Sequence, residues 1–220
     1  MSIILNIDTA QENASVSLSE NGRLLGVLQN AIQKDHAVFL HPAIKQLLNE
    51  HRLDMKSIQA VSVTSGPGSY TGLRVGMAAA KGICHALKIP LISLCTLKTM
   101  ANAVKSIAIE KDALICPMID ARRMEVFTAL FNVSMETIIS PIPMILNEHS
   151  FSAELQQQKI MFFGSGSAKF NSIINSKEAI FLSSVDWMES MSELAAESFS
   201  KAEFSDLATL TPNYLKEYQA

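Results

Sequence analysis

The chain has 220 residues, 48% of them hydrophobic and 18% charged, which is enough to bury the core of one large domain or two small ones. Its net charge of −3 argues against a protein that holds nucleic acid alone, because such proteins carry a basic stripe. The three cysteines lie in apolar runs without a CxxC pair, which indicates buried reduced thiols. With no signal peptide and no apolar run near the roughly 20 residues that span a bilayer, the sequence predicts a cytoplasmic protein without membrane contact.

The first half of the chain alternates between strand and helix patterns. Short apolar or alternating runs predict strands, an Asn21-Gly22 pair predicts a hairpin, and apolar residues at helical spacing predict helices. In chain order the predicted elements are strands at Ile3–Ile7, Ala14–Leu18 and Leu24–Leu28, a helix at His36–Glu50, a strand at Ile58–Thr64, a helix at Gly72–Leu87, a strand at Pro90–Leu94 and a helix at Thr96–Ile107. The order βββαβαβα predicts an α/β fold with helices covering a mixed sheet.

The second half of the chain repeats the start of the first. Leu114–Asp120 ends in Ile-Asp, as Ile4–Asp8 does, and a second strand pattern follows at Glu125–Phe131. This predicts a duplicated core in two lobes, residues 1–108 and a reduced lobe of residues 109–220. After Ser140 the expected features are a loop at "PIPM", a strand at Lys159–Phe163, a turn at "GSGS", a helix at Met191–Lys201 and the tail "TPNYLKEYQA".

The glycine-rich stretch "SGPGSYTGLRVG" lies between a predicted strand and a predicted helix. It is not a Walker A loop, because Leu73 and Arg74 follow Gly72, and Thr71 breaks a GxGxxG fingerprint. Two interpretations remain open: the loop amides hold an anion, or the loop is a tight turn with Ser69 or Thr71 capping the helix. The candidate nucleotide-proximal residues are Asp8, Gly66, Gly68, Ser69 and Asp120.

The helix after this loop carries small residues at every fourth position, namely Gly72, Gly76, Ala80 and Cys84. Ala78 and Gly82 form a neighbouring row. Each glycine inside a helix costs about 1 kcal/mol relative to alanine, so some close packing should offset it. We predict that the helix docks on another subunit; the alternative is burial between its own sheet and the preceding helix. The predicted interface residues are Val38, Phe39, Gly72, Gly76, Ala80 and Lys81.

Histidines and aspartates offer weaker signals. His36 and His41 are five positions apart, whereas a metal pair on one helix face needs a spacing of four, so no metal site is predicted. Asp8 and Asp120 each end a strand, where a carboxylate can position a magnesium–phosphate complex between two lobes or simply form a turn. Arg122 and Arg123 are expected to pair with carboxylates such as Glu125.

Four segments together carry a family resemblance: "IDTA", "GPGSYTGLRVGMAAAKGICHAL", "IDARRMEVF" and "PNYLK". They resemble the bacterial tRNA threonylcarbamoyladenosine biosynthesis family TsaB, also called YeaZ. The resemblance implies the two-lobed actin/sugar-kinase/Hsp70-like (RNase H-like, ASKHA) α/β fold with mixed sheets, a duplicated βββαβα core and a reduced second lobe.

The resemblance also implies a role. Members are non-catalytic subunits that form a homodimer when alone and a heterodimer with TsaD, the paralogue that carries the metal and the catalytic site. With the ATPase TsaE, the assembly transfers threonylcarbamoyl to the adenosine at tRNA position 37. No cofactor is then expected on the lone chain, ATP/ADP and metal are expected on the partners, and tRNA is met only through the complex.

Departures from catalytic relatives agree with that role. The chain lacks the HxxxH pair of TsaD, and Thr9-Ala10 and Ala121-Arg122 stand where sugar kinases place phosphate-turn glycines after the strand aspartate. Two alternatives stay open: a stand-alone phosphotransferase using Asp8 and Asp120, and a metallopeptidase, as an old peptidase-like label of the family holds. The histidine spacing argues against the second alternative.

Overall fold

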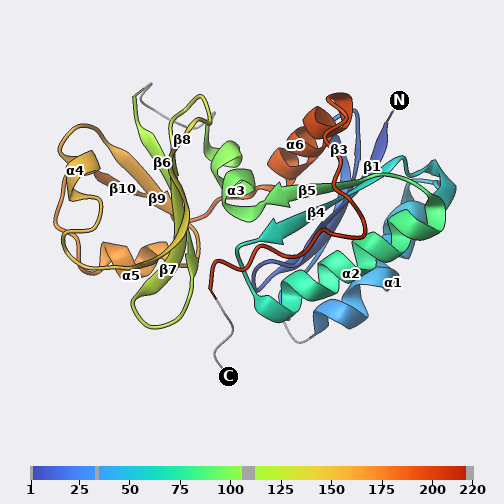
Figure 1. The fold of residues 1–220 in the computed structure, drawn as a ribbon, viewed down its shortest axis with the longest axis horizontal. Helices are drawn as coiled ribbons and strands as arrows, with labels where there is room; N and C mark the ends of the chain where they lie inside the picture. The colour runs from blue at the N-terminus through green and yellow to red at the C-terminus, as the bar shows by residue number, and fades with distance from the viewer. Residues whose placement is uncertain (1, 33–34, 106–111, 217–220) are drawn as a thin grey trace. The chain divides into compact units, whose positions relative to one another are not determined.

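The computed structural model describes residues 2–32, 35–105 and 112–216, which divide into two compact units (Figure 1). Unit 1 comprises the chain up to Thr96 together with Met188–Tyr214, and unit 2 comprises Leu97–Trp187 and the residues from Leu215. None of the helices in the described ranges is both long and apolar enough to cross a membrane.

Unit 1 contains a five-stranded mixed sheet in the order β3-β2-β1-β4-β5. The first three strands form an antiparallel meander, and β4 and β5 run parallel to β1. The strands are β1 Ile3–Asp8, β2 Ala14–Glu20, β3 Arg23–Asn30, β4 Ala60–Gly66 and β5 Leu91–Cys95. The helices of this unit are α1 His36–Glu50, a 3-10 turn at Met55–Ser57, α2 Tyr70–Leu87 and α6 Met188–Ser200.

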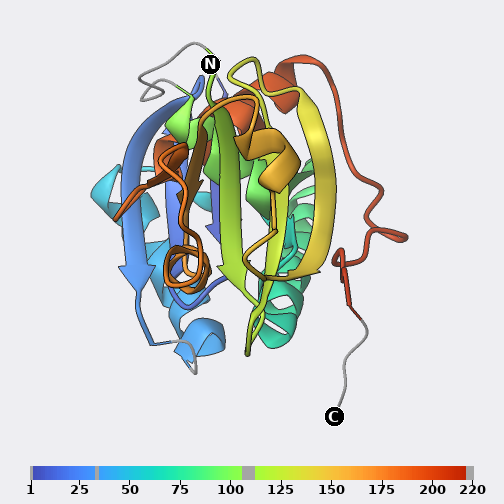
Figure 2. The ribbon, with the colours of Figure 1, turned by 90° about the vertical axis from the view of Figure 1, so that its left-hand side faces the viewer.

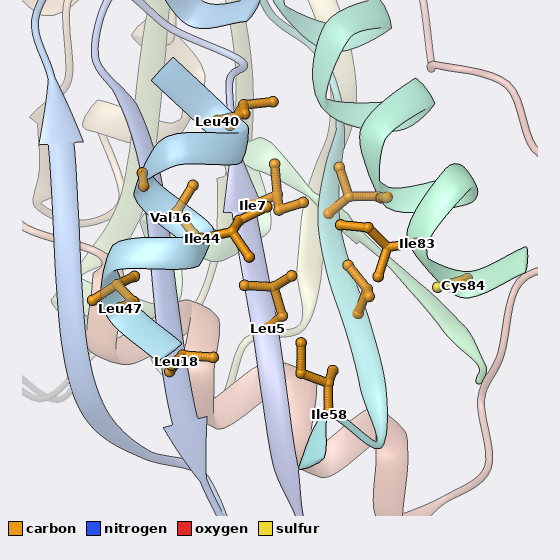
Figure 3. Close-up of a cluster of buried hydrophobic side chains, with 14 of the residues drawn as sticks. Leu5, Ile7, Val16, Leu18, Leu40, Ile44, Leu47, Ile58, Ile83 and Cys84 are labelled. Atoms are coloured by element: carbon orange, nitrogen blue, oxygen red, sulfur yellow. The ribbon is translucent and has the colours of Figure 1, made fainter. Parts of the chain in front are cut away.

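One face of this sheet is apolar and is covered by α1 and α2. Strand side chains alternate between faces, so Leu5 and Ile7 of β1 point to the same side as Val16 and Leu18 of β2. The buried residues of α1 and α2 pack onto these side chains in one hydrophobic core (Figure 3).

The other face of the same sheet is covered by α6 and is partly polar. Asn6 lies at its centre, where its amide donates to Ser17 Oγ and Ser19 Oγ at 3.2 Å and accepts from Ser62 Oγ at 2.6 Å. These side chains are buried but paired, which removes the penalty for burying polar groups. Ile4, Ile92 and Met191 supply the apolar part of this contact.

Unit 2 repeats the sheet topology of unit 1. Its strand order is β10-β9-β6-β7-β8, with β6, β7 and β8 antiparallel and β9 and β10 parallel to β6. The strands are β6 Leu114–Asp120, β7 Glu125–Phe131, β8 Thr137–Ile145, β9 Ile160–Phe163 and β10 Ala179–Phe181. Its helices are α3 Thr96–Val104, whose first residue is counted with unit 1, and the short α4 Ser152–Leu155 and α5 Ser167–Asn171.

The short helices α4 and α5 lie on one face of this second sheet (Figure 2). Phe151, Phe162 and Phe170 meet beneath them, with ring centroids 4.9–5.7 Å apart in edge-to-face arrangements. Because α4 and α5 have four and five residues against 15 and 18 in α1 and α2, the second lobe is reduced, as predicted. The shared topology agrees with the predicted duplication.

Two predictions are corrected by the fold. The stretch around "PIPM" is not a loop but lies within the edge strand β8, where Pro143 pairs with Phe127; an edge strand tolerates proline because one side of its backbone has no ladder. The predicted division at residue 108 also differs from the observed one, since α6 packs on the sheet of unit 1 and Leu97–Val104 group with unit 2. The end of the predicted helix at Ile107 lies outside the described residues.

Candidate partner-docking face

The turn between β1 and β2 positions the start of both α1 and α2. His36 Nε2, at the first residue of α1, donates to the Glu12 carbonyl at 2.9 Å. The amide of Ser69, the residue before α2, donates to the Ala10 carbonyl at 2.6 Å. Ser69 also caps α2, since its Oγ accepts from the Gly72 amide at 3.3 Å. The two helices therefore start beside the same turn and lie on the same face of the sheet (Figure 1).

The predicted small-residue row of α2 faces the chain's own sheet. Gly72, Gly76 and Ala80 are all buried, and a Cβ built on Gly76 would overlap the Thr9 hydroxyl. That hydroxyl donates to the Gly72 carbonyl at 2.7 Å, so β1 and α2 approach closely here. The placement of this row on a partner surface is therefore corrected, because the glycines admit the end of β1 within the monomer.

The neighbouring row of α2 points outward instead. Ala78, Gly82 and Ala86 are exposed at four-residue spacing, and a Cβ built on Gly82 would meet nothing within 4 Å. On α1, Val38 is 74% exposed, and Phe39 is partly buried against the core. We call Val38, Phe39, Ala78, Gly82 and Ala86 the docking face.

The predicted interface residue Lys81 lies beside this row and is half-buried. Ala78 and Gly82 form a recognisable row in the sequence, but Gly72, Gly76 and Ala80 are the α2 glycines and alanine predicted for the interface. The deciding signal was present, since the large apolar residues Leu73, Met77 and Ile83 mark the opposite side of α2 as the buried one.

The glycine-rich loop is packed from within unit 1. The amide of Asn213 in the C-terminal segment donates to the Ser65 carbonyl at 2.6 Å, and a Cβ on Gly66 would crowd the Asn213 carbonyl. Gly66 also has φ +119°, which strongly favours glycine. A Cβ on Gly68 would overlap the Ala10 carbonyl. Gly66, Gly68 and Ser69 thus serve close internal packing, which favours the tight-turn interpretation of the loop.

An aromatic–arginine cluster follows the loop and was not predicted. The rings of Tyr70 and Tyr214 lie 4.8 Å apart, and the Arg74 guanidinium lies 4.0 Å from the Tyr70 ring centroid. Arg74 Nε donates to the Tyr214 hydroxyl at 2.9 Å, and this bond raises the pKa of Arg74 above its usual value. The cluster ties the "PNYLK" segment to the first turn of α2.

The two predicted aspartates are each held within their own unit. Asp8 is buried, and its Oδ1 accepts from Thr64 Oγ1 at 2.8 Å and from the Ala10 amide at 3.0 Å. Asp120 pairs with Lys169 Nζ at 2.8 Å. Within residues 2–32, 35–105 and 112–216, no three His, Cys, Asp or Glu side chains gather as metal ligands would. A magnesium–phosphate role for the two aspartates stays a prediction.

Comparison with known proteins gives a consistent relationship. Residues 10–220 match the family described as "TsaD: tRNA N6-adenosine threonylcarbamoyltransferase". The tRNA threonylcarbamoyladenosine biosynthesis protein TsaB of Bacillus subtilis is 27% identical over 99% of this chain and 95% of its own length.

Solved structures share the fold. A Pseudomonas aeruginosa structure, described as an uncharacterized protein with similarity to peptidase YEAZ, matches with a TM-score of 0.84 at 24% identity, covering 98% of this chain and all of that one. An inorganic polyphosphate/ATP-glucomannokinase from Arthrobacter sp. strain KM matches with a TM-score of 0.50 at 10% identity, covering 92% of this chain and all of that one. The predicted sugar-kinase-like fold class is confirmed.

Proposed function

The chain belongs to the TsaD family, and from this premise we propose that it is a TsaB-type subunit without catalytic activity of its own. In this proposal it binds TsaD as a heterodimer, is assisted by TsaE, and takes part in transferring threonylcarbamoyl to the adenosine next to the tRNA anticodon. The predicted resemblance to TsaB is confirmed, and tRNA threonylcarbamoyladenosine biosynthesis is the pathway named for the Bacillus subtilis relative.

The outward face of α1 and α2 carries the proposal. Val38 is a large apolar side chain that is 74% exposed, and exposed apolar surface of this kind favours protein association. The exposed Ala78, Gly82 and Ala86 would let the backbone of a partner helix approach closely. The same face would serve the homodimer of the lone chain and the heterodimer with TsaD.

The environment of the loop and of Asp8 supports a non-catalytic role. The Ser69 amide donates to Ala10 and the Gly72 amide to Ser69 Oγ, so these two N–H groups of the α2 start are directed into the chain. Asp8 is buried at the end of β1 and accepts a hydrogen bond from Thr64. We therefore assign ATP/ADP and the metal to the partners. Because the Bacillus subtilis relative is named for tRNA threonylcarbamoyladenosine biosynthesis, we also propose that the chain meets tRNA through the complex, in the cytoplasm.

The test compares two alanine-to-leucine substitutions at exposed helix positions. Ala78→Leu adds bulk on the docking face, and Ala153→Leu adds the same bulk on α4 of unit 2. Both variants should unfold at the wild-type denaturant midpoint. Ala78→Leu should lose self-association in sedimentation, TsaD capture and tRNA modification with TsaD and TsaE, while Ala153→Leu should keep all three.

Three results would overturn the proposal. If Ala78→Leu is folded, and self-associates and captures TsaD to the same extent as Ala153→Leu, the docking face is not the interface. Metal-dependent ATP turnover by the lone wild-type chain would favour the phosphotransferase alternative, and chelator-sensitive proteolysis would favour the metallopeptidase.

A further inference from the structure

The hairpin between β6 and β7 holds two arginines in a backbone conformation that arginine rarely adopts. Arg122 has φ +71° and Arg123 has φ +47°, both in the left-handed region that glycine and asparagine favour. The hairpin is closed by the Glu125 amide donating to the Arg122 carbonyl at 3.0 Å and the Ala121 amide donating to the Glu125 carbonyl at 3.1 Å. Both arginine side chains are exposed.

The carboxylates next to these arginines are occupied by lysines. Lys169 Nζ lies 2.8 Å from Asp120 Oδ1, and Lys216 Nζ lies 2.6 Å from Glu125 Oε2. The expected pairing of the arginines with Glu125 is therefore not found. In the part of the chain that the structure describes, neither arginine side chain has an ion-pair or hydrogen-bond partner, so both positive charges are uncompensated.

The carboxylate of Asp120, in its charged form, holds the backbone of the hairpin in place. Partial burial disfavours the carboxylate, but the hydrogen bond from Lys169, the bond from the Arg122 amide at 2.6 Å and the charge of Lys169 outweigh it and lower the pKa of Asp120. The Asp120 amide also donates to Ser165 Oγ at 3.1 Å. The backbone that presents both arginines is thus held by interactions that do not use their guanidinium groups.

Two adjacent exposed guanidinium groups suit phosphate oxygens, because each is permanently charged and offers paired N–H donors. A free nucleotide binds in a concave site that buries most of its surface. Arg122 and Arg123 instead lie on an exposed hairpin tip, which can approach the backbone of a polymer from outside. This chemistry matches sequence-independent contacts to RNA, which are made mainly by arginine and lysine with phosphates.

We propose that Arg122 and Arg123 bind backbone phosphates of the tRNA when the chain works in its complex. This inference rests on the proposed function and adds a substrate-positioning site in unit 2. It also fits the net charge of −3, since two local charges can assist a complex without making the lone chain a tight RNA binder.

The test measures tRNA affinity of the chain–TsaD complex across a sodium chloride series. The charge-removing variant is Arg122→Gly/Arg123→Gly, because glycine accepts the left-handed backbone without the side chains. The control is Lys98→Ala/Lys177→Ala, which removes two other exposed charges of unit 2. Arg122→Lys/Arg123→Lys keeps the charge and loses the paired donors.

Because the glycine variant can no longer neutralise two of the phosphates, its plot of log affinity against log salt should be shallower than that of wild type by about 1.4 to 1.8. The control should keep the wild-type slope, and the lysine variant should keep the slope with weaker binding. An unchanged slope in the glycine variant would overturn the proposal, as would a defect confined to ATP or ADP binding.

The experiment distinguishes failure of the phosphate site from failure of the proposed function. Capture of TsaD by the glycine variant is measured first, and it should equal wild type. If even the wild-type chain captures no TsaD, the proposed function fails. The same salt series with the lone chain at low salt, where weak RNA binding is measurable, then decides the role of the arginines. If the glycine substitutions leave the salt slope of the lone chain unchanged, the proposed phosphate site is overturned as well.

Discussion

Thr9 explains why α2 contains glycine where a helix would prefer alanine. Its buried hydroxyl donates to the Gly72 carbonyl and occupies the space that a Cβ of Gly76 would need. Gly82, in contrast, has open space around it and gains nothing from being glycine within the monomer. Gly76 therefore allows close packing within the monomer, whereas Gly82 does not, although both are glycines of the same helix.

We expect Gly76→Leu and Gly82→Leu to separate folding from association. Overpacking against Thr9 should lower the free energy of unfolding of Gly76→Leu by about 2 kcal/mol or more. Gly82→Leu should unfold at or slightly above the wild-type midpoint, because leucine favours a helix over glycine by about 0.8 kcal/mol and nothing obstructs it here, but it should lose self-association and TsaD binding. Denaturant titration and sedimentation measure the two effects. Equal stability of the two variants would mean that β1 does not restrict α2 at Gly76.

The buried thiols give a pH-dependent prediction. Burial raises the pKa of Cys84 to about 11 and that of Cys116 to about 12, although a hydrogen bond with Thr128 opposes the shift at Cys116. Both thiols are therefore neutral in the folded state at pH 8, and thiol reagents should modify them only after unfolding.

The sign of the stability change follows from the same shifts. Below the unfolded thiol pKa of about 9, both states are protonated and stability is complete; above it the unfolded chain loses its protons first, so stability should fall as pH rises toward 11 to 12. Denaturant midpoints measured between pH 8 and 11 test this. The prediction fails if Cys84→Ala/Cys116→Ala shows the same alkaline loss as wild type.

At the scale of elements, the segment that follows α6, residues 201–214, packs across unit 1, and we call it the strap. Leu207 and Leu210 pack against the apolar core beneath α1 and α2, and Asn213 and Tyr214 contact the glycine-rich loop and the first turn of α2. Figure 1 shows this segment in red, running from α6 and then along α2. The segment has little regular structure but carries tertiary contacts.

Replacing the two strap leucines should destabilise unit 1. Leu207→Ala/Leu210→Ala removes half-buried side chains, and we expect a loss of about 1–3 kcal/mol in total, below the cost of fully buried leucines. Glu203→Ala/Thr211→Ala, at two exposed positions of the same segment, is the control. Chemical denaturation followed by the CD signal reports the difference. Indistinguishable midpoints for the two pairs would show that the strap only lies on the surface.

Elements with strong local patterns were predictable, and those defined by tertiary context were not. Helix α1 and strands β6 and β7 have the predicted bounds, because apolar periodicity and turn residues agree there. Strand β8 was missed because its prolines favour a loop, and only its edge position permits pairing. Strand β10 has three residues, too few for a period-two pattern to emerge.

At the scale of the molecule, the two Ile-Asp strand endings revealed a real repeat. The orders β3-β2-β1-β4-β5 and β8-β7-β6-β9-β10 describe the same topology. The sequence did not reveal that most of α3 groups with unit 2 and that α6 groups with unit 1. The apolar face of a helix predicts burial, but it does not identify the sheet against which the helix packs. Of the residues predicted for the interface, Val38 is exposed, whereas Gly72, Gly76 and Ala80 are buried in the monomer; docking through Val38 and Phe39 stays a prediction.

Net charge sets the expected behaviour of the whole chain toward RNA. With a formal charge of −3, the lone chain should bind tRNA no more tightly than about 10⁻⁶ M at physiological salt. Fluorescence anisotropy with labelled tRNA measures this, and the chain–TsaD complex provides the comparison. Sub-micromolar binding by the lone chain with a steep salt slope would contradict the prediction.

The return of Met188–Tyr214 to unit 1 also fixes an order of events during synthesis. A ribosome makes all of Leu97–Trp187 before it makes α6, the helix that covers the second face of the sheet of unit 1. Unit 1 therefore cannot be completed until most of unit 2 has been synthesised. Meanwhile the nascent chain leaves that face open to water. Asn6 and its serine neighbours can hydrogen-bond to solvent during this interval, so the open face, which also carries Ile4 and Ile92, is less prone to aggregate than a wholly apolar one.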